Sequence, residues 1–451
     1  MFKKVLVANR GEIALRVIRT CKEMGIQSVA VYSDADKDSL PVRYADEAQY
    51  IGPPLSRKSY LNMERIVEAA KKAGAEAIHP GYGFLAENAA FAEFCDKNGC
   101  IFVGPSAPTH RLTGEKIASR KIAARQGVPI LPGSEEAISS LEEAAKRAGE
   151  IGYPVMVKAS GGGGGRGMKV ASSGEELKII WSVAKGEAVA AFKNPDLYIE
   201  KYLEEPRHIE FQILGDKSGN YVHLGERECS IQKRYQKLIE ESPSFFVDGE
   251  LRKKMAEAAI RIMRSVGYVN AGTVEFLVDA RKNFYFNEIN SRLQVEHPVT
   301  EMVTGIDLVK QQFIIAAGGN IAFKQQEIRQ HGWAIECRIN AEDPDDDFRP
   351  SPGKVTSLAL PGGMGVRVDT HLYAGYEIPP FYDSLLGKLI VWGTDRDEAI
   401  KRMKRALGEF CLEGLKTTLP FHLKVMESKE FVQGNFSTSF LKEFDRKGRN
   451  T

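Results

Sequence analysis

The sequence predicts a multidomain protein that combines an α/β part with α+β parts. Its 451 residues are enough for about two to four domains with their own cores. Strands and helices alternate near the N-terminus, which is typical of a doubly wound parallel sheet. Further along, two pairs of apolar strands enclose a glycine-rich segment and a short polar turn, and the residues from 330 onward mix strands and helices.

The N-terminal residues 1–114 are expected to form the first, doubly wound domain. Two strand–helix–strand units are predicted there, with elements at residues 5–8, 13–24, 28–32, 60–73, 77–79, 88–97 and 101–103. The turn Asn9-Arg10-Gly11-Glu12 lacks the glycine fingerprint of a dinucleotide-binding loop. Nicotinamide binding is therefore not expected at this turn.

The composition limits which binding partners and which cellular location the protein can have. Lys and Arg total 62 against 60 for Asp and Glu, so no strong net charge favours nucleic acid or a membrane surface. The six cysteines form no C-x-x-C pair, which argues against a zinc ribbon or a dense disulfide framework. No apolar run approaches the ~18 residues of a membrane helix, and the run at 5–8 is too short for a signal peptide. We expect a cytoplasmic protein.

A run of glycines follows the apolar strand 155–159. Gly162, Gly164 and Gly167 match G-x-G-x-x-G, but the chain continues as another strand at 168–171, where a Rossmann unit requires a helix. Met168 also stands where a Walker A loop needs lysine. A strand–glycine loop–strand hairpin can fold its backbone amides over phosphates, with Lys158 as a counter-charge. The alternatives are a flexible linker and a surface lysine.

Two carboxylates are predicted to meet across a second hairpin. Strands 273–279 and 283–290 flank a short polar turn, which sets Glu275 opposite Glu288. Two carboxylates paired in this way lie about 5 Å apart and repel each other. A magnesium ion between them reverses the sign of that interaction, because Mg²⁺ prefers carboxylates, water and substrate phosphates. If residues 287–297 stay extended, Asn290, Arg292 and Glu296 share this face; the alternative is a half-buried strand with a solvated polar face.

The remaining segments carry weaker signals. The charged residues 229–237 predict a solvated basic loop, and residues 250–266 have the spacing of an amphipathic helix. In the C-terminal region we expect strands at 333–340 and 387–392, a turn at 361–363 and a helix at 396–410. These elements predict a mixed α+β domain that closes over the site.

Several motifs together resemble biotin carboxylase, the ATP-grasp component of biotin-dependent carboxylases. They are NRGEIALR (9–16), HPGYGFLAEN (79–88), KASGGGGGRGMKV (158–170), EKYLEEPRHIE (200–210), ERECSIQKRYQK (226–237), NEINSRLQVEHPVTEM (287–302) and ECRINAEDP (336–344). The resemblance implies a pre-ATP-grasp domain (1–114), an ATP-grasp domain (115–329) with a mobile lid (about 132–203), and a C-terminal biotin carboxylase domain (330–451). It also implies that ATP activates bicarbonate as carboxyphosphate and that the carboxyl group passes to biotin on a carrier.

The resemblance assigns roles to the matching residues. Lys116, Lys158, His208, Gln232 and the lid residues Gly163, Gly164 and Gly165 look like contacts to ATP, and Glu200 and Leu203 look like the adenine hinge. Glu275, Glu288 and Asn290 look like ligands for Mg²⁺ or Mn²⁺. Lys237, Arg292, Gln294 and the backbone of Val295 look like the bicarbonate pocket, Glu296 like the general base, and Arg338 like the cation beside the biotin enolate.

These residue types suit the implied chemistry. Phosphoryl transfer depends mainly on positioning and charge neutralisation, which divalent cations, lysines and backbone amides supply. Bicarbonate is a planar anion, so an arginine fork fits it better than a point charge. For Arg338 alone, a structural salt bridge on its strand is an equal alternative.

The sequence also predicts what must act with this chain. No A-M-K-M biotin-attachment motif and no carboxyltransferase segment occur in it, so a biotinylated carrier and a transferase on separate chains are expected. The resemblance suggests a homodimer with Arg19 and Glu23 near its interface. Tyr235 and Asn287 differ from the residues expected in the biotin carboxylases of acetyl-CoA carboxylases. The sequences of residues 236–244 and 290–298 are more similar to those of two-subunit pyruvate carboxylases. The final acceptor stays open between pyruvate and an acyl-CoA. Another ATP-grasp ligase and a non-catalytic nucleotide sensor are the alternative functions.

Overall fold

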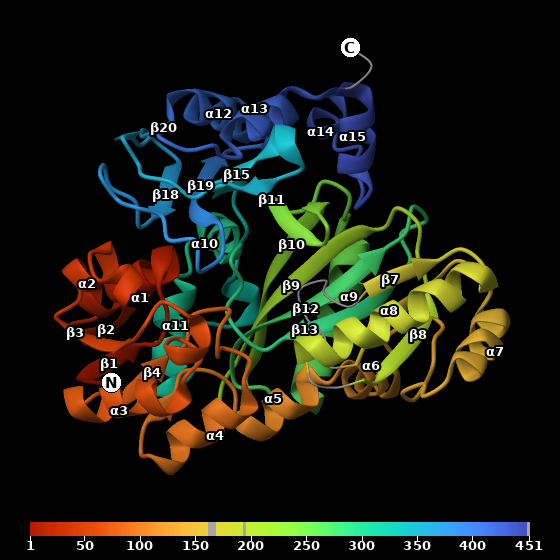
Figure 1. The fold of residues 1–451 in the computed structure, drawn as a ribbon, viewed down its shortest axis with the longest axis horizontal. Helices are drawn as coiled ribbons and strands as arrows, with labels where there is room; N and C mark the ends of the chain where they lie inside the picture. Colours follow the sequence, from red (N-terminus) through yellow and green to blue (C-terminus); the bar gives the residue numbers. More distant parts are fainter. Residues whose placement is uncertain (161–167, 193–194, 449–451) are drawn as a thin grey trace.

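The computed structural model describes residues 1–160, 168–192 and 195–448. Its N-terminal elements are β1 (Lys4–Val7), α1 (Gly11–Glu23), β2 (Gln27–Ser33), α2 (Leu40–Tyr44), β3 (Glu47–Gly52), α3 (Met63–Ala73), β4 (Ala77–His79), α4 (Ala89–Lys97) and β5 (Ile101–Phe102). The five strands are parallel in the order β3-β2-β1-β4-β5 (Figure 1). Val5 and Val7 pack with α1, and Leu6 packs with α3 on the other face. Helices on both faces confirm the doubly wound prediction, although strand β3 was not expected.

A small antiparallel subdomain follows the helices α5 (Ala107–Gly114) and α6 (Lys116–Arg125). Its elements are α7 (Leu141–Ile151), β6 (Val155–Ala159), β7 (Met168–Ala171), α8 (Gly174–Phe192) and β8 (Leu197–Lys201). The strands are ordered β7-β6-β8, and α7 and α8 pack on them around the buried Trp181. Lys158 on β6 pairs with Met168 on β7, so the strand–loop–strand prediction is confirmed. Gly163, Gly164 and Gly165 lie outside the described residues.

The largest sheet has eight antiparallel strands in the order β13-β12-β9-β10-β11-β14-β19-β18. They are β9 (Arg207–Gly215), β10 (Tyr221–Lys233), β11 (Gln236–Ser242), β12 (Asn270–Val278), β13 (Phe284–Asn290), β14 (Trp333–Asn340), β18 (Val366–Thr370) and β19 (Leu385–Gly393). The predicted boundary at residue 330 lies just before β14, and the sheet continues across it because β11 pairs with β14.

Alternation along β9 and β12 gives this sheet one apolar and one polar face. Phe211 and Phe276 belong to the core beneath helix α9 (Gly249–Ser265). The alternate side chains His208, Glu210 and Glu275 therefore face the opposite side. The two-residue alternation of the strands therefore places these three side chains on the polar face of the sheet.

The remaining helices join the parts of the molecule. They are α10 (His297–Thr304), α11 (Leu308–Ala316), α12 (Arg396–Glu409), α13 (Leu419–Glu427), α14 (Lys429–Val432) and α15 (Phe440–Gly448), with the short strand pairs β15 (Glu342–Asp343)–β16 (Arg349–Pro350) and β17 (Ser357–Ala359)–β20 (Cys411–Glu413). Phe313 of α11 packs into the core of the N-terminal sheet, and α11 lies beside β4 in Figure 1. The six cysteines are free thiols. Within the described ranges, every helix is too short or too polar to cross a bilayer.

Two sequence predictions were wrong. Residues 229–237 do not form a solvated loop but the ends of β10 and β11, joined by a tight turn at Arg234 and Tyr235. Residues 287–297 are not extended throughout, because β13 ends at Asn290 and α10 begins at His297. Pro298 in the first turn of α10 favours this helix start, since proline lacks the amide hydrogen that the helix interior requires.

Candidate active site

One large cleft, of ≈ 2000 Å³, is lined by the N-terminal sheet, the antiparallel subdomain, the large sheet and the C-terminal region. The predicted site residues that line it are Lys116, Lys158, Glu200, Leu203, His208, Gln232, Lys237, Glu275, Glu288, Asn290, Arg292, Gln294, Val295 and Arg338. Glu296 is fully buried directly behind Lys237 and Arg338. The structure thus brings together all of the predicted site residues that it describes.

The two strands of the acidic hairpin pair as predicted. Glu275 on β12 is the register partner of Glu288 on β13. Glu275 accepts hydrogen bonds from Lys237 (2.9 Å) and Asn290 (2.9 Å), and Lys116 donates to Glu288 (2.8 Å). Burial raises the pKa of Glu275, but the neighbouring charges of Lys237 and His208 outweigh it and hold the pKa well below its ordinary value. Glu275 is therefore ionised.

These side chains also fit a divalent cation. Two carboxylates lie opposite each other on one face of a hairpin, and the amide oxygen of Asn290 is on the same wall of the cleft. Oxygen donors of this kind suit a hard ion such as Mg²⁺. The assignment of Glu275, Glu288 and Asn290 as metal ligands stays a prediction.

Lys237 on β11 is the electrostatic centre of the site. Its ammonium lies 2.6 Å from Glu210, 2.9 Å from Glu275 and 2.7 Å from Glu296. Burial lowers the pKa of Lys237, but the three carboxylates outweigh it and raise the pKa well above its usual value. Lys237 is thus a fixed cation that connects the acidic hairpin with Glu296.

Glu296 is held between two cations. One oxygen accepts from Lys237 and the other from Arg338 (2.9 Å), and Arg338 in turn donates through Nε to Glu240 (2.6 Å). Burial raises the pKa of Glu296, but Lys237 and Arg338 outweigh it and hold the pKa far below its ordinary range. The carboxylate is therefore charged at neutral pH.

Arg292 reaches the site from the loop between β13 and α10. Its guanidinium donates to Gln294 (2.8 Å) and Asn290 (3.2 Å), and its Nε lies 3.0 Å from Glu87 of the N-terminal domain. Glu87 was missed in the sequence analysis, although it belongs to the polar motif at 79–88. Glu210 and Glu240 were missed as well. The alternation His208-Ile209-Glu210 could have indicated Glu210, because alternate strand residues share a face.

Glu200 on β8 is the centre of a second group of charged residues in the cleft. Glu200 is buried and forms ion pairs with Lys158 and, at 2.6 Å, with Arg120 of α6. Burial lowers the pKa of Lys158 even though the Glu200 charge opposes this. Nearby, Gln232 donates to the carbonyl of Cys229 (2.7 Å) and contacts His208 (3.1 Å).

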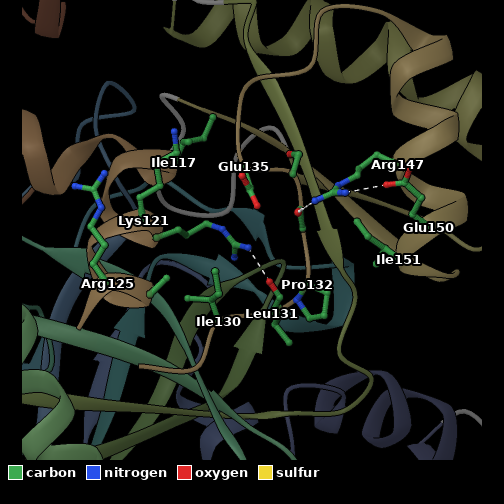
Figure 2. Close-up of a pocket in the computed structure, with 14 residues that line it drawn as sticks. Ile117, Lys121, Arg125, Ile130, Leu131, Pro132, Glu135, Arg147, Glu150 and Ile151 are labelled. Atoms are coloured by element: carbon green, nitrogen blue, oxygen red, sulfur yellow. Dashed lines mark hydrogen bonds and ion pairs between the residues drawn. The ribbon is translucent and has the colours of Figure 1, made fainter. Parts of the chain in front are cut away.

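A smaller cavity of ≈ 650 Å³ lies beside the segment that enters the antiparallel subdomain (Figure 2). Arg120 of α6 donates to the carbonyl of Leu131 (2.7 Å), and Arg147 of α7 donates to that of Gly133 (2.8 Å). The next residue, Ser134, pairs through its amide with Ile199 (2.7 Å). Two arginines from different subdomains therefore hold this connecting segment, and Arg120 links it to Glu200.

The opposite end of the cleft was not predicted. It is lined by N-terminal and C-terminal side chains, including Asn9, Arg10, Tyr82, Phe84, Phe381 and Tyr382. The Arg10 guanidinium stacks 4.2 Å above the Tyr382 ring. Aromatic and polar side chains together suit a flat ring with hydrogen-bonding groups.

Comparison with known proteins is consistent along the whole chain. The matching family profiles are "Biotin carboxylase, N-terminal domain" (residues 1–109), "Carbamoyl-phosphate synthase L chain, ATP binding domain" (115–324) and "Biotin carboxylase C-terminal domain" (336–443).

Individual relatives agree with these profiles. Biotin carboxylase 1 of Bacillus subtilis is 56% identical over 99% of this chain and 100% of its own length. A pyruvate carboxylase subunit of Methanothermobacter thermautotrophicus is 55% identical over 99% of this chain and 91% of its own. The biotin carboxylase domain dimer of Hydrogenobacter thermophilus 2-oxoglutarate carboxylase, solved with MgADP, ADP and bicarbonate, superposes with a TM-score of 0.96 at 51% identity and 98% coverage of both chains. This chain therefore belongs to the biotin carboxylase family: it is a ligase that uses ATP, Mg²⁺ and bicarbonate to carboxylate biotin.

Proposed function

We propose that four groups of residues share the reaction in the cleft: metal ligands, ATP-binding residues, a bicarbonate pocket with its base, and a cation beside biotin. Glu275, Glu288 and Asn290 hold the divalent cation, which when bound neutralises the phosphate charge. Lys116, Lys158, His208, Gln232, Glu200 and Leu203, together with Gly163, Gly164 and Gly165, bind ATP. The observation that carries this proposal is the position of Lys237, whose ammonium contacts both Glu275 and Glu296. The phosphate end and the bicarbonate end of the cleft are thus adjacent.

Bicarbonate is bound by Arg292, Gln294, the backbone of Val295 and Lys237. Arg292 and Gln294 both line the cleft and contact each other, and the planar guanidinium of Arg292 suits a planar anion. Glu296 takes the proton from the bicarbonate hydroxyl, and the bicarbonate oxygen then attacks the terminal phosphorus of ATP. ADP leaves, and carboxyphosphate remains in the cleft.

The carboxyl group is then transferred to a ring nitrogen of biotin. That nitrogen gives its proton to the departing phosphate and forms the new bond to carbon, while the bond from carbon to the phosphate oxygen breaks and phosphate is released. Arg338 stabilises the negative charge that develops on the oxygen of the biotin ring. Its guanidinium is held between Glu240 and Glu296, so it is oriented before biotin arrives.

ATP cleavage by the purified chain tests this function. We expect ADP release to require Mg²⁺ and bicarbonate and to increase on addition of free biotin. ADP release that does not depend on bicarbonate, or that needs an amine acceptor, would contradict the proposal. Nucleotide binding without turnover would support a sensor instead.

The chain's partners are also proposed. Members of the family act with a biotinylated carrier and a carboxyltransferase, and we place both on separate chains here. We further propose domain boundaries near residues 114 and 330, a cytoplasmic location and a homodimer with Arg19 and Glu23 near its interface. The chain is 56% identical to a biotin carboxylase and 55% identical to a pyruvate carboxylase component, so sequence identity does not distinguish pyruvate from an acyl-CoA as the final carboxyl acceptor. We favour pyruvate. Identification of the biotinylated protein that co-purifies with this chain tests that choice.

A further inference from the structure

Lys388 on β19 is a fully buried lysine at the junction of three parts of the chain. Its ammonium donates a hydrogen bond to the carbonyl of Val295 (2.9 Å), in the loop that precedes α10. It also forms an ion pair with Glu12 (3.2 Å), the second residue of α1. A third neighbour is Tyr82, whose ring centre is 5.7 Å away. One cation therefore joins the C-terminal region, the loop between β13 and α10, and the N-terminal domain.

Burial of the Lys388 side chain is unfavourable unless its ammonium has partners. A buried ammonium loses its hydration and requires a compensating charge and hydrogen bonds. Glu12 is 4% exposed, and neither of its oxygens has a hydrogen-bond partner among the described residues. Burial raises the pKa of Glu12 to about 7, against the opposing effect of the Lys388 charge. Glu12 is thus the carboxylate that faces the buried Lys388 ammonium, and the ion pair between them is shielded from water.

The carbonyl that Lys388 holds belongs to the peptide between Val295 and Glu296. Because a peptide bond is planar and trans, fixing this carbonyl also fixes the direction of the Glu296 amide on the opposite side. Glu296 is the proposed base, and the Val295 backbone belongs to the proposed bicarbonate pocket. Lys388 itself does not line the cleft, although its register partner Arg338 on β14 does.

We propose that Lys388 is a positioning residue for bicarbonate: it holds the Val295–Glu296 peptide in its productive orientation, with Glu12 as counter-ion. The inference rests on the proposed function of the cleft. It concerns bicarbonate and leaves ATP binding aside, because the nucleotide end is built from Glu200, Lys158 and Arg120, which have no contact with this loop among the interactions described above. A purely structural ion pair would instead affect stability alone, or all substrates equally.

Three variants of the full-length chain test this role: Lys388→Met, Glu12→Gln and the double variant. ATP cleavage is measured at saturating biotin, first with bicarbonate varied and then with ATP varied. Loss of a hydrogen bond from a charged donor corresponds to about 10-fold to 100-fold. We expect Lys388→Met to raise the KM for bicarbonate by this factor and to leave the KM for ATP within about twofold.

The double variant separates positioning from stability, because it also removes the carboxylate that Lys388→Met leaves buried without a partner. We expect it to melt at a higher temperature than Lys388→Met while its KM for bicarbonate stays raised. It also serves as the test variant if Lys388→Met does not fold. A wild-type KM for bicarbonate in the double variant, or an equal loss for both substrates, would overturn the role of Lys388. A wild-type enzyme with no bicarbonate response would overturn the proposed function instead.

Discussion

At the scale of single residues, the site is a set of buried carboxylates in direct contact with two cations, Lys237 and Arg338. Lys237 contacts Glu210, Glu275 and Glu296, and Arg338 contacts Glu240 and Glu296. Sequence spacing was enough to pair Glu275 with Glu288, because a hairpin turn sets the register of the strands beside it. Glu240 could not be found in this way, since its partner is about one hundred residues away in the chain.

The metal assignment predicts the behaviour of Glu288→Gln. The substitution keeps the shape of the side chain but removes the charge that faces Glu275. We expect the rate of ATP cleavage to fall by about 10²-fold to 10³-fold, as when one charge-stabilising group is lost, and the Mg²⁺ concentration for half-maximal rate to rise. Glu250→Gln, on the exposed surface of α9, is the matched control and should be neutral. A wild-type rate in Glu288→Gln would refute the assignment.

Glu296→Gln should separate nucleotide binding from bicarbonate chemistry. Removing a general base lowers the rate by about 10²-fold to 10⁴-fold, whereas the affinity for ATP, measured with a fluorescent analogue, should not change. In the wild-type enzyme burial opposes ionisation of Glu296, but Lys237 and Arg338 hold its pKa far below the ordinary range. Protonation of Glu296 should therefore cause no loss of rate between pH 8 and about pH 5, since an ordinary Glu titrates near 4.3. A bicarbonate response that persists in Glu296→Gln would assign the base elsewhere.

At the scale of elements, β10 and β11 show why charge patterns mislead. Arg227 has no exposed surface, and its guanidinium donates to Glu210 (2.5 Å), Gln212 (2.9 Å) and Thr300 (2.9 Å). Charged residues usually indicate a solvated segment, because a charge without a partner is costly to bury. Here the partners of Arg227 come from β9 and α10, which the local charge pattern could not include.

The turn between these strands is itself testable. Arg234 and Tyr235 both have positive φ (51° and 68°), a conformation that most side chains avoid and that asparagine tolerates. We expect Tyr235→Asn to be more stable than Tyr235→Ala by about 1 kcal/mol, measured by urea denaturation. Both variants lose the aromatic ring, so the difference reports the backbone alone. Equal stabilities would show that the turn relaxes in the variants.

At the scale of the whole molecule, buried polar contacts join the N-terminal and C-terminal regions. Arg10 and Asp36 form two hydrogen bonds of 2.8 Å, and Asp36 also accepts from Tyr60 (2.7 Å) and from Tyr376 of the C-terminal region (3.4 Å). Tyr382 covers the Arg10 guanidinium. Arg10 and Tyr382 of this cluster line the cleft, so its stability bears on the shape of the site.

Asp36→Asn should destabilise the protein in a pH-dependent way. It leaves the buried Arg10 without its counter-charge, a change that costs about 3–5 kcal/mol. Burial raises the pKa of Asp36, but Arg10 outweighs it and the folded-state pKa lies below the ordinary value. The ion pair therefore stabilises the folded protein above about pH 4, and this contribution is lost as the pH falls through the folded-state pKa.

Thermal melting checks this prediction. The difference in melting temperature between wild type and Asp36→Asn should be largest at neutral pH and should shrink toward about pH 3, below the ordinary Asp pKa. Glu93→Gln on the exposed face of α4 is a control for a surface carboxylate and should show little difference at any pH. A constant difference for Asp36→Asn across this range would contradict a charge-based role.

The sequence by itself determined the two hairpins, including the pairing of Glu275 with Glu288, because their strands are near in the chain, and it determined the doubly wound class through the alternation of strands and helices. Its motifs also indicated the family, which the comparisons establish. Only the tertiary structure decided that residues 229–237 form the paired ends of two strands, with 229–232 buried, and that Lys388, Glu12 and Val295 meet. The physical reason is that a buried charge is tolerated only beside its partner, and these partners come from distant parts of the chain.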